Sequence, residues 1–369
     1  MSNPFELAKR NFGFGFMRLP MNGEEVDLAH TTRMVDRFLE LGFNYFDTAH
    51  GYLNGKSELA LKACLTSRYP RDRYMLTNKL SGSHFQTQAD IRPLFQSQLE
   101  ACGVEYFDLY LMHAQNRENF VHYQNCRAYE TALELKAEGK IRHLGISFHD
   151  TADVLDRILT TYPQVEAVQI QFNYLDFEDH RVQSRLCYEV CRKHQKPIIV
   201  MEPVKGGKLV QLPTDAQQIL DALNGGSSAS YAIRYAAGFE GIAMVLSGMG
   251  SMDMVEDNCG FMADFQPLNP AELEAVRQVS QILRQQSLVP CTGCRYCTEG
   301  CPQAIPIPEI FTCLNQRILD GGGQEAQYAQ ITQQVKASAC IQCGLCEKVC
   351  PQHIEVPKLL QGVVKTFER

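Results

Sequence analysis

Eight cysteines near the C-terminal end of the chain have the spacing of metal-cluster ligands. Cys291, Cys294, Cys297 and Cys301 form a C-x2-C-x2-C-x3-C run before Pro302, and Cys340, Cys343, Cys346 and Cys350 form a second one before Pro351. Thiolates with this spacing hold iron–sulfur cubanes, each of which takes four sulfur ligands. Two complete runs, each with a trailing proline, predict two [4Fe-4S] clusters.

The two runs resemble those of bacterial ferredoxins that carry two clusters. In that pattern the first three cysteines of a run hold one cube and the fourth holds the other cube. The resemblance pairs Cys291, Cys294 and Cys297 with Cys350, and it pairs Cys340, Cys343 and Cys346 with Cys301. Zinc is the alternative metal, but it favours pairs of C-x2-C and leaves surplus thiolates in each run.

Composition sets limits on the class of protein. The chain has 369 residues, 45% of them hydrophobic, and a formal net charge of −7, which argues against a nucleic-acid partner. The first residues lack the apolar core of a signal peptide, and no apolar run reaches the roughly 20 residues that span a bilayer. Cubanes together with seven scattered, unpaired cysteines indicate a reducing compartment. We therefore expect a cytoplasmic protein without a membrane partner.

Short apolar runs alternate with amphipathic segments before the cysteine runs. The expected strands are 14–19, 44–47, 74–80, 106–112, 142–147, 167–172, 197–202 and 242–247, and the expected helices are 31–41, 57–67, 87–102, 125–138, 151–160, 181–195 and 226–237. Alternating strands and helices indicate βαβ units and a parallel sheet. Eight strands in about 250 residues favour a closed (β/α)8 TIM barrel over an open sheet, and no G-x-G-x-x-G motif follows a strand.

The sequence divides into two expected domains. Residues 1–265 are expected to form the α/β barrel. Residues 266–369 are expected to hold an amphipathic linker helix at 270–285 and a ferredoxin-like domain with both clusters.

Four polar residues fall at or just after the ends of neighbouring expected strands, where the working residues of a barrel lie. Asp47, Lys79 and His113 close the second, third and fourth strands, and Tyr52 follows in the loop after Asp47. A tyrosine is a weak acid, with an ordinary pKa of about 10. A lysine beside it stabilises the phenolate, and an aspartate holds the lysine. With a histidine that donates to a carbonyl oxygen, this set could polarise and protonate a C=O group.

These four residues resemble the catalytic tetrad of the aldo-keto reductase family, in NYFDTAHGYLNGKSE, LTNKL and DLYLMH. GKIRHLGIS (139–147), VQIQFN (168–173), MEPVKGGKL (201–209) and VLSGM (245–249) extend the resemblance over most of residues 10–260. It implies that Tyr52 is the general acid, that Lys79 and Asp47 tune it, and that His113 orients a small carbonyl substrate. It also implies NAD(P)H as hydride donor. The whole chain resembles the ferredoxin-tailed branch of the family.

The resemblance further implies a set of contacts to the nicotinamide cofactor. The nicotinamide would be held by Ser147, Gln169 and Asn173. The segment that passes the pyrophosphate contains Glu202, Val204, Gly207 and Leu209, and the adenosine end is bordered by Ser247, Gly248 and Asn258. Many family members place a lysine and an arginine on the 2′-phosphate of NADPH. Gly248 and Met254 take those positions here, with Asp253 nearby. NADH, another basic residue or a decayed nucleotide site therefore all stay open.

The electron count leaves three functional hypotheses. Nicotinamide transfers two electrons together and a cubane transfers one, yet the sequence shows no flavin motif to convert between them. The first hypothesis is a nicotinamide-dependent carbonyl reductase with structural or redox-sensing clusters. The second is a reductase whose clusters, fed by an external donor, deliver electrons to a substrate in the barrel. The third is an electron carrier with a vestigial barrel.

Overall fold

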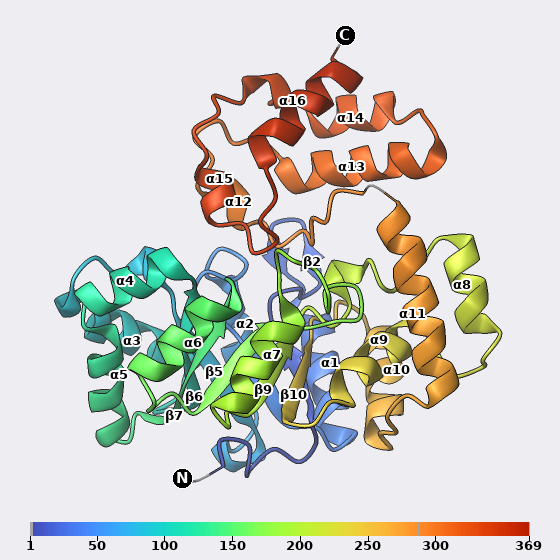
Figure 1. Cartoon of the computed structure of the whole chain (residues 1–369). Coiled ribbons are helices and arrows are strands. Elements are labelled where there is room, and N and C mark those ends of the chain that lie inside the picture. The colour runs from blue at the N-terminus through green and yellow to red at the C-terminus, as the bar shows by residue number, and fades with distance from the viewer. Residues whose placement is uncertain (1–2, 287, 369) are drawn as a thin grey trace.

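The computed structural model describes residues 3–286 and 288–368. Its centre is a closed barrel of parallel strands in the order β1-β10-β9-β8-β7-β6-β5-β4 (Figure 1). The barrel strands are β1 (Phe12–Gly15), β4 (Tyr45–Asp47), β5 (Met75–Leu80), β6 (Phe107–Gln115), β7 (Ile141–Phe148), β8 (Ala167–Gln171), β9 (Ile198–Met201) and β10 (Ile242–Ser247). A small hairpin, β2 (Met21–Asn22) and β3 (Glu25–Val26), lies outside it. The predicted (β/α)8 architecture is confirmed.

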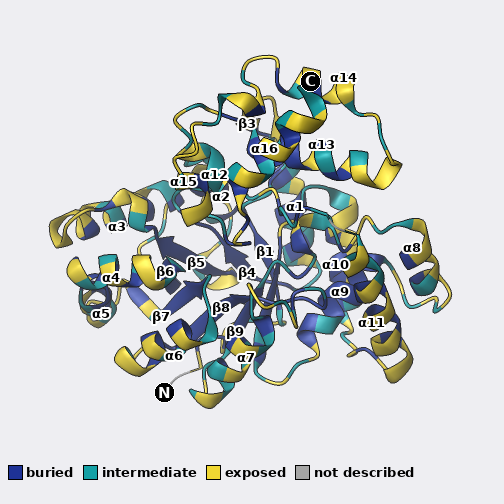
Figure 2. Cartoon of the chain, turned by 45° about the horizontal axis from the view of Figure 1, so that its top comes forward, coloured by how far each residue is buried: buried dark blue, intermediate teal, exposed yellow. Residues whose placement is uncertain are grey.

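Helices surround the barrel and expose their outer faces, while the strands are buried (Figure 2). The helices are α1 (Leu28–Glu40), α2 (Lys56–Leu61), α3 (Gln88–Cys102), α4 (Arg117–Asn125), α5 (Ala128–Ala137), α6 (Ala152–Thr161), α7 (Ser184–Lys193), α8 (Thr214–Asp221), α9 (Ser228–Ala237) and α10 (Met252–Ala263). The expected helix at 125–138 is interrupted, because Arg127 takes a left-handed backbone conformation with φ 51° between α4 and α5. None of the helices in the described residues is long and apolar enough to cross a membrane.

Side chains fill the interior of the barrel. Tyr45, Leu109, Leu111 and Met244 form a buried apolar layer there, and Phe5 from the segment before β1 packs against it. Thr77 donates to the Tyr45 hydroxyl at 2.6 Å, so the one polar group of that ring is satisfied. The filled interior leaves the open ends of the barrel as the place for a site.

Helix α11 (Pro270–Gln285) packs on the barrel rather than on the cysteine-rich domain. It contacts α8 and α9, and Ala275, Val276 and Val279 join a buried cluster with Leu220 and Tyr231. Its N-terminus carries a capping box in which Asn269 accepts from the backbone and Glu272 bonds back. The apolar packing of the barrel therefore extends through α11, beyond the boundary expected at residue 265.

The cysteine-rich domain has a core of its own. Its helices are α12 (Tyr296–Glu299), α13 (Ile307–Asp320), α14 (Glu325–Ile331), α15 (Leu345–Lys348) and α16 (Val356–Phe367). Ile310, Phe311, Leu360 and Val363 are buried in its centre. The domain stands over one end of the barrel (Figure 1).

Contacts between the two domains lie at the carboxyl ends of the barrel strands. The amides of Gln171, at the end of β8, and Gln352 exchange hydrogen bonds of 2.7 and 3.2 Å. Lys205, buried and ion-paired with Asp176, donates to Gln352 at 3.1 Å. A Cβ on Gly206 would lie 2.7 Å from the Cα of Thr292, so only glycine permits this close approach. The cysteine-rich domain thus covers the end of the barrel at which sites form.

Candidate active site and cluster sites

Asp47 and Lys79 form a buried ion pair at adjacent strand ends. Asp47 is the last residue of β4, and its Oδ1 lies 2.5 Å from Nζ of Lys79, the penultimate residue of β5. The ammonium also donates to the carbonyl oxygen of Thr48 at 2.7 Å. Burial lowers the pKa of Lys79 and raises the pKa of Asp47, and the attraction within the pair opposes both shifts. With two acceptors on its ammonium, the lysine is held as a cation.

Tyr52 is placed as a proton donor beside that cation. The Lys79 ammonium lies 4.7 Å from the centroid of the Tyr52 ring. Burial raises the pKa of the Tyr52 hydroxyl, and so does the nearby carboxylate of Asp47. Both effects favour the neutral phenol over the phenolate.

His113 in β6 completes the predicted group. Its ring lies edge-on to Tyr52, with centroids 5.9 Å apart, and its Nδ1 is 2.7 Å from Oγ of Ser81. Burial, together with the Lys79 charge, holds the pKa of His113 well below its ordinary range. The imidazole is neutral, and its Nε2 stays available to a ligand.

These groups face a cavity of about 480 Å³ at the barrel mouth. Eleven of the predicted catalytic and cofactor residues line it: Asp47, Tyr52, His113, Ser147, Gln169, Glu202, Val204, Gly207, Ser247, Gly248 and Asn258. The Ser147 hydroxyl accepts from the Ala114 amide at 2.8 Å, and the Asn258 amide donates to Ser247 at 3.2 Å. Both hydroxyls are thereby oriented by neighbouring groups.

Two predicted nucleotide contacts lie outside the lining. The Asn173 amide donates to Asp176 at 2.8 Å and to the carbonyl oxygen of Glu202 at 3.0 Å, so it braces the interface between the domains. Leu209 is buried among the side chains of the α8, α9 and α11 region. Lys79 is also absent from the lining, and it acts on the cavity through Asp47 and Tyr52.

The end of the cavity near α10 is acidic. Asp253 and Asp257 line it together with Met254 and Gly248. Among the described residues of the lining, Arg18 is the one lysine or arginine. Its guanidinium already bonds to Glu202 at 3.3 Å and to the Thr292 carbonyl at 2.8 Å. A 2′-phosphate would therefore meet carboxylates at this end without a free cation.

The cysteines of the two runs surround two separate cavities. Cys291, Cys294, Cys297 and Cys350 line the first cavity, and Cys301, Cys340, Cys343 and Cys346 line the second. Each cavity thus takes three thiols from one run and the fourth from the other. The Gly293 amide donates to Sγ of Cys291 at 3.5 Å. In the described part of the chain no three His, Cys, Asp or Glu side chains converge on a single ion.

The cysteine-rich domain contributes to the barrel cavity itself. Cys294, Tyr296 and Pro351 are part of its lining, and the ring centroid of Tyr296 lies 6.4 Å from that of His113. Tyr296 was not among the residues predicted from the sequence. The available signal was an aromatic residue inside a cysteine run, but its partner could not be identified without the docking of the two domains.

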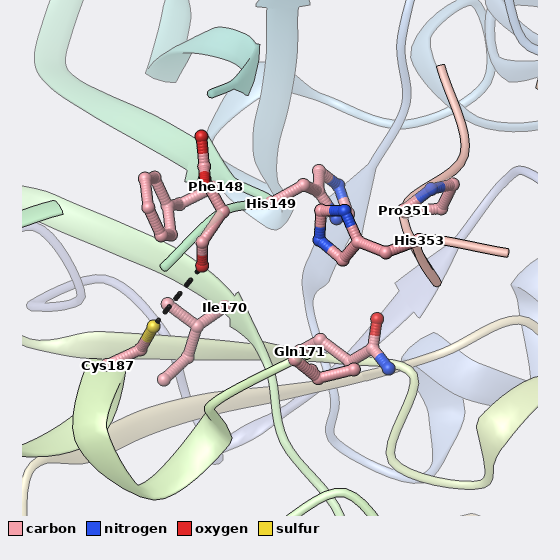
Figure 3. Close-up of a pocket in the computed structure, with 9 residues that line it drawn as sticks. Phe148, His149, Ile170, Gln171, Cys187, Pro351 and His353 are labelled. Atoms are coloured by element: carbon pink, nitrogen blue, oxygen red, sulfur yellow. Dashed lines mark hydrogen bonds between the residues drawn. The ribbon is translucent and has the colours of Figure 1, made fainter. Parts of the chain in front are cut away.

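A smaller cavity lies beside this one, between β7, β8 and the segment after Cys350 (Figure 3). His149 and His353 both line it (Figure 3). Burial, with smaller contributions from His353 and Lys79, lowers the pKa of His149 to about 4. His149 Nδ1 is buried without a hydrogen-bond partner among the described residues. Burial at the interface between the domains thus favours the neutral form of His149.

A closed parallel barrel with this tetrad at its mouth, joined to a domain with two four-thiol cavities, defines an iron–sulfur oxidoreductase. Comparison with known proteins agrees. The aldo/keto reductase family model matches residues 11–281 and the 4Fe-4S dicluster domain model matches residues 285–351. The chain belongs to the aldo/keto reductase family, and its C-terminal domain is of the two-cluster type.

Curated relatives match parts of the barrel. The NADH-specific methylglyoxal reductase of Escherichia coli is 27% identical over 195 residues, covering 47% of this chain and 57% of the relative. The 9,11-endoperoxide prostaglandin H2 reductase of Trypanosoma cruzi is 26% identical over 196 residues, covering 52% and 64%. The matches thus span less than two thirds of these two relatives. An aldo-keto reductase of Mycolicibacterium paratuberculosis is 26% identical over 273 residues, covering 73% and 86%.

Solved structures share the barrel fold. An aldo-keto reductase of Klebsiella pneumoniae in complex with NADPH superposes with a TM-score of 0.60 at 20% identity, covering 73% of this chain and 90% of the other. The holo form of a Bacillus halodurans aldo-keto reductase gives 0.60 at 24% identity, covering 73% and 91%.

Proposed function

We propose that this protein is a nicotinamide-dependent carbonyl reductase in which Tyr52 is the proton donor. The observation that carries the proposal is the buried Asp47–Lys79 pair, which holds an ammonium 4.7 Å from the ring centroid of Tyr52 at the wall of a ligand-sized cavity. A buried ion pair that only stabilised the fold would not require the Tyr52 phenol beside it. His113, neutral and oriented by Ser81, adds a second donor to the same wall.

The proposed reaction reduces a C=O group to an alcohol. A bound nicotinamide would supply the hydride to the carbonyl carbon. The Tyr52 hydroxyl gives its proton to the carbonyl oxygen, which becomes the alcohol oxygen. The electron pair of the broken O–H bond stays on Tyr52 as a phenolate beside Lys79. Nε2 of His113 donates to the carbonyl oxygen and orients it.

The residues proposed to hold the cofactor follow the cavity. Ser147 and Gln169 are proposed to bind the nicotinamide amide. Glu202, Val204 and Gly207 are proposed to border the pyrophosphate, and Ser247, Gly248 and Asn258 the adenosine end. All are lining residues, whereas Asn173 and Leu209 are left out because they do not reach the cavity.

We propose NADH rather than NADPH as the preferred cofactor. The 2′-phosphate dianion of NADPH would approach Asp253 and Asp257, and Arg18 is already bonded to Glu202 and Thr292. Charge-assisted bonds from lysine or arginine are what normally hold a phosphate. The name of the Escherichia coli relative, an NADH-specific methylglyoxal reductase, is consistent with this preference and with a small carbonyl substrate.

One observation favours a second candidate function. Cys294 is shared between the first four-thiol cavity and the barrel cavity. A cluster there would adjoin the substrate, so an external one-electron donor could supply electrons through it without nicotinamide. Tyr52 and His113 would then deliver protons to the reduced substrate.

An isotope experiment separates the two candidates. NADH deuterated at C4 is incubated anaerobically with methylglyoxal and the cluster-loaded protein. Deuterium on the carbon of the product alcohol, lost in Tyr52→Phe, supports hydride transfer at this site. The product could instead carry no deuterium and form only with dithionite as donor. That result would contradict hydride transfer from nicotinamide and favour the cluster-fed reaction.

A further inference from the structure

Glu58 is a buried carboxylate that the proposed reaction does not use. It lies in the first turn of α2, and only 1% of its surface is exposed. Its Oε1 accepts from the side-chain amides of Asn78 at 2.7 Å and of Gln98 at 3.2 Å. Its Oε2 lies 2.8 Å from Nδ1 of His50, and the imidazole donates because an ionised carboxylate can only accept. Glu58 thus joins three segments of the barrel.

Two of these donors hold the strand end that carries Lys79. Asn78 precedes it in β5, and its Oδ1 accepts from the backbone amide of Lys79 at 2.8 Å. Gln98 in α3 donates to the carbonyl oxygen of Lys79 at 3.0 Å. Both side chains are fully buried. Glu58 is therefore connected, through two amides, to the backbone on both sides of the Lys79 side chain.

The third donor holds the loop that carries Tyr52. His50 lies two residues before Tyr52, and the two residues after Tyr52, Leu53 and Asn54, have φ 54° and 55°. Residues other than glycine rarely adopt such positive values, and a strained turn of this kind persists only where its surroundings restrain it. Because Glu58 lies on the far side of the turn, its bond to His50 supplies such a restraint.

We infer that Glu58 and His50 are positioning residues that hold the Tyr52 phenol beside the Lys79 ammonium. This inference rests on the proposed function, in which a phenolate forms on Tyr52 next to Lys79. One carboxylate joins the segments of both partners, so it helps to set the 4.7 Å between the ammonium and the Tyr52 ring centroid. Glu58 and His50 lie outside the cavity lining, so they act through Tyr52 and Lys79.

The distance between the ammonium and the phenol matters for proton transfer. The attraction between a cation and a developing phenolate weakens as their separation grows. A misplacement of about 1 Å in an active site can cost about 100-fold in rate. Loosening either the Tyr52 loop or the Lys79 strand end should therefore slow the step in which Tyr52 gives up its proton.

A second bridge closes the same loop without His50. The hydroxyls of Thr48 and Ser57 are hydrogen-bonded at 2.7 Å, and Ser57 donates to the carbonyl oxygen of Phe16 at 2.9 Å. The His50 side chain is 27% exposed, unlike that of Glu58. Removal of its bond to Glu58 should therefore loosen the Tyr52 loop and leave the barrel folded, which makes His50 the main site for the test.

Matched substitutions in the full, cluster-loaded chain test the inference. The rings of His50 and His84 meet edge to face with centroids 4.7 Å apart, and of the two His50 is the one bonded to Glu58. His50→Phe keeps a ring and removes the hydrogen bond, and His84→Phe is its control. Glu58→Gln is the conservative variant. Its carbonyl oxygen can accept from the two buried amides, and its own amide can donate to Nδ1 of the other neutral tautomer of His50.

Kinetics with NADH and methylglyoxal are compared with calorimetric NADH binding and amide hydrogen exchange. We expect His50→Phe to lower kcat by about 10- to 100-fold, while KM for methylglyoxal and the dissociation constant of NADH stay within about threefold. Exchange should become faster over residues 49–56. His84→Phe should keep kcat within about twofold of the wild type and leave the exchange unchanged. Glu58→Gln should keep kcat within about threefold, because it preserves the bridge.

The outcomes separate failure of this inference from failure of the proposed function. If Tyr52→Phe abolishes reduction while His50→Phe keeps the wild-type kcat and exchange, the positioning role is overturned and the reductase stands. A loss of NADH affinity in His50→Phe as large as the loss of kcat would also overturn it, because that result shows general damage to the barrel mouth. If Tyr52→Phe reduces methylglyoxal as fast as the wild type, the proposed function itself fails, and this inference with it.

Discussion

The rings of His113 and Tyr296 meet edge to face across the boundary between the barrel and the cluster domain, with centroids 6.4 Å apart. His113 closes a barrel strand, and Tyr296 lies within the first cysteine run. Tyr52, Tyr296 and Cys294 line the same cavity. Two domains, rather than the barrel alone, form the wall around the reacting group.

The Asp47–Lys79 pair should show the energetic signature of a buried ion pair. Lys79→Met leaves the Asp47 carboxylate buried without its cation, so we expect the free energy of unfolding to fall by about 3 to 5 kcal/mol. The double variant Asp47→Asn, Lys79→Met removes both charges, so its free energy of unfolding should fall clearly less than that of Lys79→Met. Anaerobic urea denaturation measures both, and a double variant that is as unstable as the single one would contradict the pairing.

The pairing of cysteines across the two runs can be tested one cluster at a time. Cys350→Ser should remove the cluster of the first cavity and Cys301→Ser that of the second, because each serine replaces the fourth thiol of a different cavity. Each variant should retain about four iron atoms instead of about eight. Cys294→Ser should remove the same cluster as Cys350→Ser, so the double variant Cys294→Ser, Cys350→Ser should still retain about four iron atoms, whereas Cys294→Ser, Cys301→Ser should retain almost none. The reverse assignment would show that each run holds its own cluster.

Gly206 should control the docking of the cluster domain. In Gly206→Ala the new Cβ meets the backbone of Thr292 at 2.7 Å from its Cα, and backbone atoms cannot move aside as a flexible side chain can. We expect faster amide hydrogen exchange over residues 289–296 and a lower kcat. Gly321→Ala is the control, because Gly321 also has a positive φ, 70°, but has open space around it. The alanine there should cost only the backbone strain of about 1 kcal/mol. Equal exchange in both variants would refute a docking role.

Acidification should weaken the interface through His149. Its pKa is lowered to about 4 in the folded protein from an ordinary 6.5. Below about pH 6.5, His149 is therefore protonated in the unfolded chain but still neutral in the folded chain. Stability should be unaffected by this group above pH 6.5 and fall by about 1.4 kcal/mol per pH unit below it, until about pH 4. Anaerobic denaturation of wild type and His149→Gln between pH 7.5 and 5.5 compares the slopes. An unchanged slope in the variant would exclude His149 as the cause.

The local hydrophobic pattern was sufficient to predict the barrel. Most strands lie within a residue or two of the expected runs, because buried parallel strands are short continuous apolar segments. Two strands differ by more: the first was expected at 14–19 and is found at Phe12–Gly15, and the fourth was expected at 106–112 and ends at Gln115. Met17 and Arg18, which follow the first strand, line the cavity. An apolar residue that faces a ligand cavity is indistinguishable in sequence from one that faces a core.

The candidate site was predictable only where one domain determines it. Asp47, Tyr52 and His113 line one cavity because neighbouring strand ends bring them together. Leu209 packs among the side chains of α8, α9 and α11, whereas the position of Tyr296 at the cavity depends on how the cluster domain docks. The bonds from Gln352 to Gln171 and Lys205 contribute to that docking. These are single polar contacts without periodicity, so no sequence pattern predicts them.

Anaerobic calorimetric titration of the cluster-loaded protein with NADH and with NADPH shows whether the barrel binds a nicotinamide cofactor. We expect NADH to bind with a dissociation constant in the micromolar range or below. NADPH should bind at least about tenfold more weakly, because its 2′-phosphate faces Asp253 and Asp257 without a free cation. If neither nucleotide binds, the barrel is not a nicotinamide-dependent reductase, and the clusters become the source of its electrons.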